Sequence, residues 1–174
     1  MDVILVHPDI PQNTGSIART CAATKTPLHL IEPMGFEITE KAVRRAGLDY
    51  WPFVNLKIHP NWQSYLEQRG TGKVWLLSKF ASRSVYQANF GPEDSLVFGS
   101  ETMGLGAEFM AQFPSEQHLR IPMFEPGVRS LNLSNAVSLV LYEALRQLNN
   151  WTTNSAISPD PTITAQPSGS ETIK

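Results

Sequence analysis

Cysteine and long apolar runs are both scarce in this sequence. Its 174 residues include a single cysteine, Cys21, so the chain cannot form an internal disulfide bond. No segment approaches the roughly 18 consecutive apolar residues of a membrane span. Residues 1–9 have neither a basic start nor a long apolar run. We therefore expect a soluble, cytoplasmic protein without a membrane-spanning helix.

Positive charge is not in excess either. Lys and Arg number 14 against 16 Asp and Glu, which gives a formal net charge of -2 at pH 7. Such a protein has no global basic field to hold nucleic acid nonspecifically, so any RNA or DNA partner must be met by a local patch. Hydrophobic residues make up 41% of the chain, which suits a globular domain and excludes collagen, coiled coil and overall disorder.

The composition changes near the end of the chain. Of the 23 residues from 152 to 174, 13 are Ser, Thr, Pro or Gly. Such a segment cannot bury enough apolar surface to offset the entropy of ordering it. We predict one folded domain, residues 1–151, followed by a disordered tail, residues 152–174.

Short apolar runs alternate with helical patterns along the domain. The apolar runs predict buried strands at residues 3–6, 28–31, 74–77, 96–98 and 119–121. Helical patterns predict helices at residues 14–24, 39–46, 61–68, 107–112 and 132–148. This alternation predicts an α/β fold, with helices flanking a parallel sheet and ligands bound at the carboxyl ends of the strands.

Several familiar catalytic signatures are missing. The glycine loop at residues 99–106 has no following Lys-Ser/Thr, so a triphosphate site is weakly supported, and no dinucleotide fingerprint or G-x-S-x-G elbow occurs. Cys21 lies in a predicted helix without a basic partner, so we do not expect a nucleophile there. The four histidines are isolated, and we expect no metal site.

The loop after the first predicted strand contains the first candidate site. Asn13 or Thr14 is a good helix cap, and the first turn beyond it would offer free backbone N–H groups to an anion. Arg19 follows Asn13 by about one and a half turns. The alternative is an ordinary capped helix with a solvated arginine.

Two later loops complete the set of candidates. Gly99, Gly104 and Gly106 would let a flat ligand lie against the main chain, with Glu101 as the only charge, or they would simply serve a turn with positive φ. Between residues 121 and 136 the polar side chains exceed what one helix cap needs, so some must meet each other, the backbone or a ligand. These side chains are Ser130, Asn132, Ser134 and Asn135.

The motifs together resemble the SPOUT superfamily of RNA methyltransferases. Within it, they are similar to the small tRNA (cytidine/uridine) 2′-O-methyltransferases of the wobble nucleotide, the TrmL group. The resemblance covers residues 3–148. It rests on Asn13-x-Gly15-x-x-x-Arg19 and on the segments 31–36 (IEPMGF), 44–50 (RRAGLDY), 98–105 (FGSETMGL), 121–123 (IPM) and 129–136 (RSLNLSNA).

The resemblance implies a fold, a cofactor and a subunit arrangement. It implies a C-terminal deep trefoil knot, a homodimer and S-adenosylmethionine bound within the knot, with no metal. The implied cofactor-binding residues are Leu77, Ser78, Gly99, Glu101, Gly104, Ile121, Met123, Ser130, Leu131 and Asn135.

The resemblance also implies catalytic and RNA-binding residues. Asn13 and Glu101 would organise the catalytic loops, while Ser130 and Asn132 would orient Arg19 and the ribose. Because guanidinium groups stay protonated, we favour Arg19 as an electrostatic activator of the 2′-hydroxyl over a neutral base. The candidates for contact with the anticodon stem-loop of tRNA are Arg44, Arg45, Arg129 and Tyr142. Alternatively, Arg44 and Arg45 lie on an ordinary solvated helix face, and Tyr142 is a packed helix residue.

Three other functions compete with wobble methylation. The first is the same reaction on ribosomal RNA, and the second is a noncatalytic RNA-binding module of the same fold. The third is a flavodoxin-like cofactor domain, which would need a phosphate loop after the first strand. Arg19, Ser130 and Asn132 argue against loss of catalysis.

Overall fold

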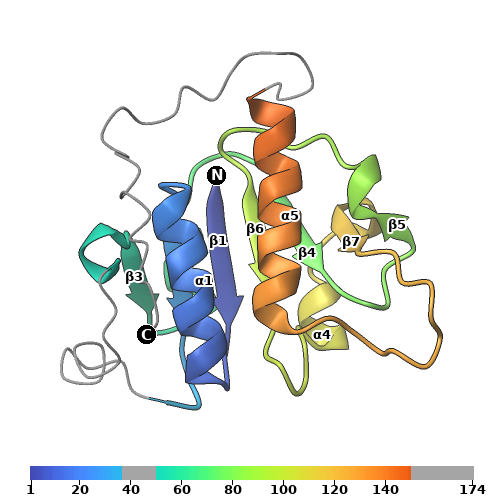
Figure 1. The fold of residues 1–174 in the computed structure, drawn as a ribbon, viewed down its shortest axis with the longest axis horizontal. Helices are drawn as coiled ribbons and strands as arrows, with labels where there is room; N and C mark the ends of the chain where they lie inside the picture. Colours follow the sequence, from blue (N-terminus) through green and yellow to red (C-terminus); the bar gives the residue numbers. More distant parts are fainter. Residues whose placement is uncertain (37–49, 150–174) are drawn as a thin grey trace, which may run out of the picture.

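A parallel sheet forms the centre of the molecule, whose computed structural model describes residues 1–36 and 50–149 (Figure 1). The strand order is β3-β2-β1-β6-β4-β7-β5, and every neighbouring pair is parallel. The strands are β1 (Asp2–Val6), β2 (Leu28–Ile31), β3 (Leu56–His59), β4 (Val74–Leu77), β5 (Arg83–Ser84), β6 (Ser95–Phe98) and β7 (His118–Arg120). The predicted α/β class is therefore confirmed.

Helices cover both faces of this sheet. They are α1 (Pro11–Ala23), α3 (Trp62–Leu66), α4 (Ala107–Met110) and α5 (Leu133–Leu148), with the 3-10 helices η1 (Trp51–Phe53), η2 (Val85–Gln87) and η3 (Ser115–Gln117). The predicted helix at residues 39–46 lies outside the described residues, as do residues 150–174, which include the predicted tail. No helix in the described ranges is long and apolar enough to cross a membrane.

Apolar runs located the central strands well. All five predicted strands are confirmed to within one residue at each end, although Ile121 lies just beyond β7. Two short strands at the sheet edges were missed. β3 has a buried residue only at His59, and β5 has two residues, so neither has the apolar run that identifies a buried strand.

The start predicted for the first helix is wrong. α1 begins at Pro11 with Ile10 as its N-cap, and no side chain caps it. Proline suits the first helical position because its φ is preset and its missing N–H needs no partner. Asn13 and Thr14 instead lie buried within the first turn. Side-chain caps do occur later, where Asn132 accepts a hydrogen bond from the backbone N–H of Ser134 at the start of α5.

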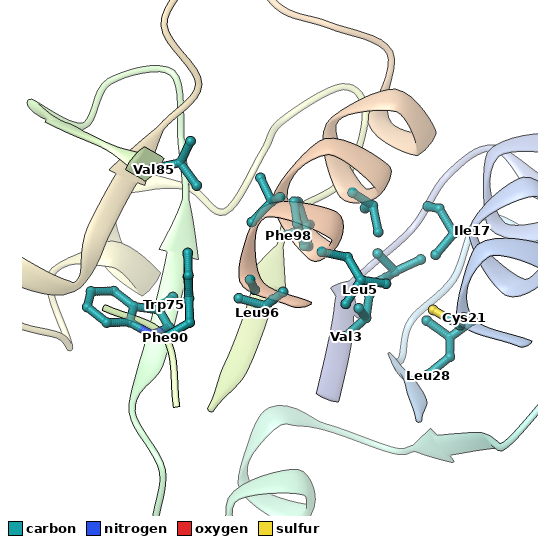
Figure 2. Packing of buried hydrophobic residues seen from close by; sticks show 14 of the residues in the cluster. Val3, Leu5, Ile17, Cys21, Leu28, Trp75, Val85, Phe90, Leu96 and Phe98 are labelled. Carbon is teal, nitrogen blue, oxygen red and sulfur yellow. The ribbon is translucent and has the colours of Figure 1, made fainter. Parts of the chain in front are cut away.

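The sheet is buried on both faces, which explains why its strands are apolar at successive positions. On one face, Val3 and Leu5 pack with α1 and α5, which lie side by side in Figure 1. Figure 2 shows Ile17 and Cys21 of α1 among the side chains of this cluster. On the other face, α3 and α4 pack against a second cluster that contains Ile4, Val6, Ile31, Val74, Leu76 and Val97.

A polar group lies within this second layer. The Nδ1 atom of His29 and the Nε2 atom of His59 are 2.8 Å apart, and both rings contact Tyr65 edge-on. The Tyr65 hydroxyl is hydrogen-bonded to the Ser95 hydroxyl at 2.7 Å. Burial, followed by the charges of His59 and Lys57, lowers the pKa of His29 from 6.5 to about 4.

Acidification should therefore destabilise the fold. Because the pKa of His29 is lower in the folded state, the unfolded chain binds a proton that the folded chain excludes. We expect the free energy of unfolding to fall by about 1 kcal/mol between about pH 7.5 and pH 5.5. Urea denaturation across this range measures the change.

Two histidine variants separate this effect from general acid sensitivity. His29→Asn should reduce the dependence of unfolding free energy on pH. His7→Asn is the matched control, because His7 is exposed and asparagine accepts its positive φ of 52°. An undiminished pH dependence in His29→Asn would contradict the assignment.

Candidate active site

The candidate site lies at the carboxyl edge of the sheet. β1 and β6 are parallel neighbours with Leu5 opposite Phe98, so the loops that follow them start side by side. After β1 the next strand, β2, lies on one side of this pair in the sheet, and after β6 the next strand, β7, lies on the other side. The pair is therefore a topological switch point. Crevices for ligands form at such points in parallel α/β sheets.

A chain of hydrogen bonds joins the three candidate loops. The two carboxyl oxygens of Glu101 accept from the side-chain amide of Asn13 and from the backbone N–H of Asp9, each at 2.8 Å. The Asn13 side-chain oxygen accepts from the amide of Asn132 at 3.0 Å. These contacts span 88 and 119 residues of sequence, so they hold the loops after β1, β6 and β7 together.

The chemistry of Glu101 sets the direction of this hydrogen-bond chain. A carboxylate can only accept, so the NH₂ group of Asn13 must face it and the Asn13 oxygen must face Asn132. Asn132 then uses its NH₂ group on Asn13 and its oxygen on the backbone N–H and the hydroxyl of Ser134. The cap of α5 and the Glu101 loop are thereby connected through Asn13, which is only 7% exposed.

The glycine loop folds back on itself. Gly104 and Gly106 have φ values of 66° and 75°, which favour glycine. A Cβ atom on Gly99 would lie 2.0 Å from the Gly104 carbonyl carbon, so only glycine fits there. Gly104 and Gly106 have the positive φ that the sequence predicted for this loop. At Gly99, the group that approaches closely is the backbone of Gly104 and Leu105 in the same loop. This turn presents Glu101 to Asp9 and Asn13.

Arg19 occupies a different side of α1 from Asn13. Six residues separate the two, so their side chains leave the helix about 120° apart. The Arg19 guanidinium carbon lies 4.6 Å from the centroid of the Tyr50 ring, within the range of a cation–π contact. The Tyr50 hydroxyl donates a hydrogen bond to the carbonyl oxygen of Gly15 at 2.8 Å. Sequence reasoning did not identify Tyr50 as a site residue.

Four of the predicted cofactor residues, Leu77, Ser78, Gly99 and Ile121, lie at the ends of neighbouring strands. Leu77 ends β4 opposite Phe98 and Leu119, and the Ser78 backbone N–H donates to Leu119 at 2.9 Å. Gly99 follows β6 directly, and Ile121 follows β7. The others lie in the glycine loop, between β7 and α5, or in the first turn of α5: Glu101, Gly104, Met123, Ser130, Leu131 and Asn135.

The predicted RNA contacts divide between described and undescribed positions. Arg129 is exposed in the segment between β7 and α5, and Tyr142 is 48% exposed on α5, so Tyr142 is not a core residue. Arg44 and Arg45 lie outside the described residues.

Cys21 has no place in this chemistry. It is buried in the α1 layer, and burial raises the pKa of its thiol to about 12, which disfavours the nucleophilic thiolate. Among the residues that the structure describes, no three His, Cys, Asp or Glu side chains gather as a metal-binding group.

Known proteins are similar to this chain in sequence and in fold. The chain matches the SpoU rRNA Methylase family over residues 1–142. A tRNA (cytidine(34)-2'-O)-methyltransferase of Saccharophagus degradans is 46% identical over 147 residues, which cover 84% of this chain and 95% of the relative. A protein of the same name from Polaromonas sp. is 45% identical over 148 residues, covering 84% and 90%.

Solved structures agree with these matches. One, described as "Structural insights into the 2-OH methylation of C/U34 on tRNA", has a TM-score of 0.79 and 46% identity, covering 86% of this chain and 96% of that one. The SpoU methyltransferase AviRb from Streptomyces viridochromogenes, solved with AdoMet, has a TM-score of 0.73 at 22% identity, covering 86% and 58%, and so shares the fold. The chain belongs to the SpoU rRNA methylase family.

Proposed function

We propose that the chain is an S-adenosylmethionine-dependent enzyme that methylates the ribose 2′-hydroxyl of nucleotide 34, a cytidine or uridine, in tRNA. The names of the relatives that are 45% and 46% identical along 84% of the chain support this activity. The observation that carries it is the hydrogen-bond chain from Asn132 through Asn13 to Glu101. These hydrogen bonds join the three segments of the polypeptide on which an RNA methyltransferase site would depend.

The residues at the strand ends suit S-adenosylmethionine. Main chain and uncharged side chains at Leu77, Gly99 and Ile121 lie at the carboxyl edge, and among the described residues a Cβ on Gly104 or Gly106 would have only its own chain neighbours within 4 Å. A neutral, main-chain-rich surface of this kind fits the adenosine part of the cofactor. Ser130, Leu131, Met123 and Asn135 would complete the site from the other side. When bound, the cofactor supplies a methyl group on a positively charged sulfur.

The protein's contribution is alignment and charge stabilisation. Methyl transfer to a hydroxyl is an in-line displacement, and holding the reacting groups in line can lower the barrier by several kcal/mol. The attacking hydroxyl must also lose its proton. The Arg19 guanidinium would bind a substrate phosphate and stabilise the developing alkoxide. Ser130 and Asn132 would orient the ribose, since Asn132 is fixed by Asn13 and by its capping role in α5.

The proposed assembly extends beyond one subunit. We place the segment from residue 121 through α5 in a deep trefoil knot, and we pair two copies in a homodimer that works in the cytoplasm. With a net charge of -2, one chain offers a small basic surface. The anticodon stem-loop would therefore lie across both subunits, against Arg44, Arg45, Arg129 and Tyr142.

The reaction can be tested by mapping the product. Incubation of tRNA with the protein and methyl-labelled S-adenosylmethionine should place label on the ribose of nucleotide 34. A 2′-O-methyl group blocks nuclease cleavage of the linkage that follows it, so digestion and mapping of the resistant linkages locate the methylated nucleotide. Label in ribosomal RNA alone would favour that substrate, and RNA binding without label would favour a noncatalytic module.

Arg19→Ala should slow methyl transfer by about 100-fold or more, as removal of one preorganised donor to a developing oxyanion does elsewhere. Single-turnover rates with labelled cofactor measure the loss. Calorimetry should show cofactor affinity within about twofold of wild type, because Arg19 is assigned to the substrate side. A variant as fast as wild type would remove Arg19 from the mechanism.

Glu101→Gln should lower methylation by about 10- to 100-fold, the effect of losing one hydrogen bond to a charged group. The new NH₂ group must face either the backbone N–H of Asp9 or the NH₂ group of Asn13, which are both donors. Steady-state methylation assays measure the loss. Glu108→Gln is the matched control, because Glu108 is exposed on α4. Equal activity of the two variants would show that the hydrogen-bond chain does not organise the site.

A further inference from the structure

The contact between Arg19 and Tyr50 has two parts. The Arg19 guanidinium carbon lies 4.6 Å from the centroid of the ring, and the ring hydroxyl donates to the Gly15 carbonyl oxygen at 2.8 Å. Gly15 precedes Arg19 by four residues, about one turn of α1. The ring is therefore tied to the same helix that carries the guanidinium, so ring and guanidinium move together with α1.

Tyr50 is itself held firmly. Its ring is half-buried and packs against the core cluster between the sheet and α1. Its carbonyl oxygen accepts from the backbone N–H of Phe53 at the end of η1, and η1 contacts α1. The ring is thus a fixed surface rather than a freely rotating side chain.

Such a surface has a definite effect on an arginine. An exposed arginine samples many rotamers, and contact with a fixed aromatic face restricts them. Restriction before the substrate arrives lowers the entropy lost when the reacting groups are aligned.

We propose that Tyr50 is a positioning residue for methyl transfer: its ring, bonded to the carbonyl of Gly15, holds the Arg19 guanidinium ready for the ribose and its phosphate. This role rests on the proposed function. Tyr50 touches neither substrate nor cofactor in it, and acts through Arg19 alone. The ring face is the essential element, and the hydroxyl fixes its orientation.

Two substitutions separate the ring from the hydroxyl. Tyr50→Leu, which removes both, should lower kcat about tenfold while the KM values for tRNA and cofactor stay within about twofold. Tyr50→Phe, which keeps the ring, should restore kcat to within about threefold of wild type. Tyr86→Leu is the control, because Tyr86 is exposed in η2 and should tolerate the same change. Thermal denaturation checks that all three variants fold.

A double variant distinguishes positioning from support of the fold. If Tyr50 acts through Arg19, then adding Tyr50→Leu to Arg19→Ala should cause no further loss of rate in single-turnover assays. A further tenfold loss in that background would overturn the proposal. So would a Tyr50→Leu enzyme with wild-type kcat.

A second measurement is independent of activity. The Arg19 side-chain protons should show an upfield ring-current shift by NMR, retained in Tyr50→Phe and lost in Tyr50→Leu. Absence of this shift in the wild type would overturn the role of Tyr50. Absence of tRNA methylation by the wild type would instead overturn the proposed function. The two failures are therefore distinguishable.

Discussion

The arrangement of the site depends on the two hydrogen bonds that Glu101 accepts. They come from the backbone of Asp9 and the side chain of Asn13, both in the loop and helix that follow β1. Since a carboxylate offers no donor, each partner must turn an N–H group towards it. The orientation of Asn13 then dictates that of Asn132, and Asn132 in turn caps α5. One acidic side chain thereby orders three loops that are distant in sequence.

The parallel sheet makes this contact possible. Strands β1 and β6 are neighbours in register, so the chain leaves both at one edge and their loops need little length to meet. Apolar side chains buried on both faces hold the strands rigidly, which keeps the loop ends in fixed positions. Methyl transfer requires that the methyl donor and the hydroxyl be precisely aligned. The rigid sheet would supply most of this alignment, and the polar side chains of the loops would adjust it further.

The parts of the molecule that sequence predicts well are those governed by local patterns. Apolar runs identified the central strands, whereas β3 and β5 have too few buried residues to leave such a pattern. Asn13 is a residue type common at helix caps, but Pro11 starts the helix and Asn13 is used in a tertiary contact. Its partners lie 88 and 119 residues away, and no local signal reports them. Tyr50 was missed for the same reason, since only the fold brings it to Arg19.

Helix α1 links the two halves of the site mechanically. On one side, Asn13 bonds to Asn132, and Thr20 lies 3.2 Å from the hydroxyl of Ser138 on α5. On the other side, Gly15 and Arg19 contact Tyr50 next to η1. The helix is therefore held from two directions, and a helix bonded along both sides can neither rotate nor slide without breaking contacts on each. In the proposed mechanism, the hydrogen bonds from Glu101 to Asn13 and Asn132 would therefore also help to fix the position of the Arg19 guanidinium on the same helix.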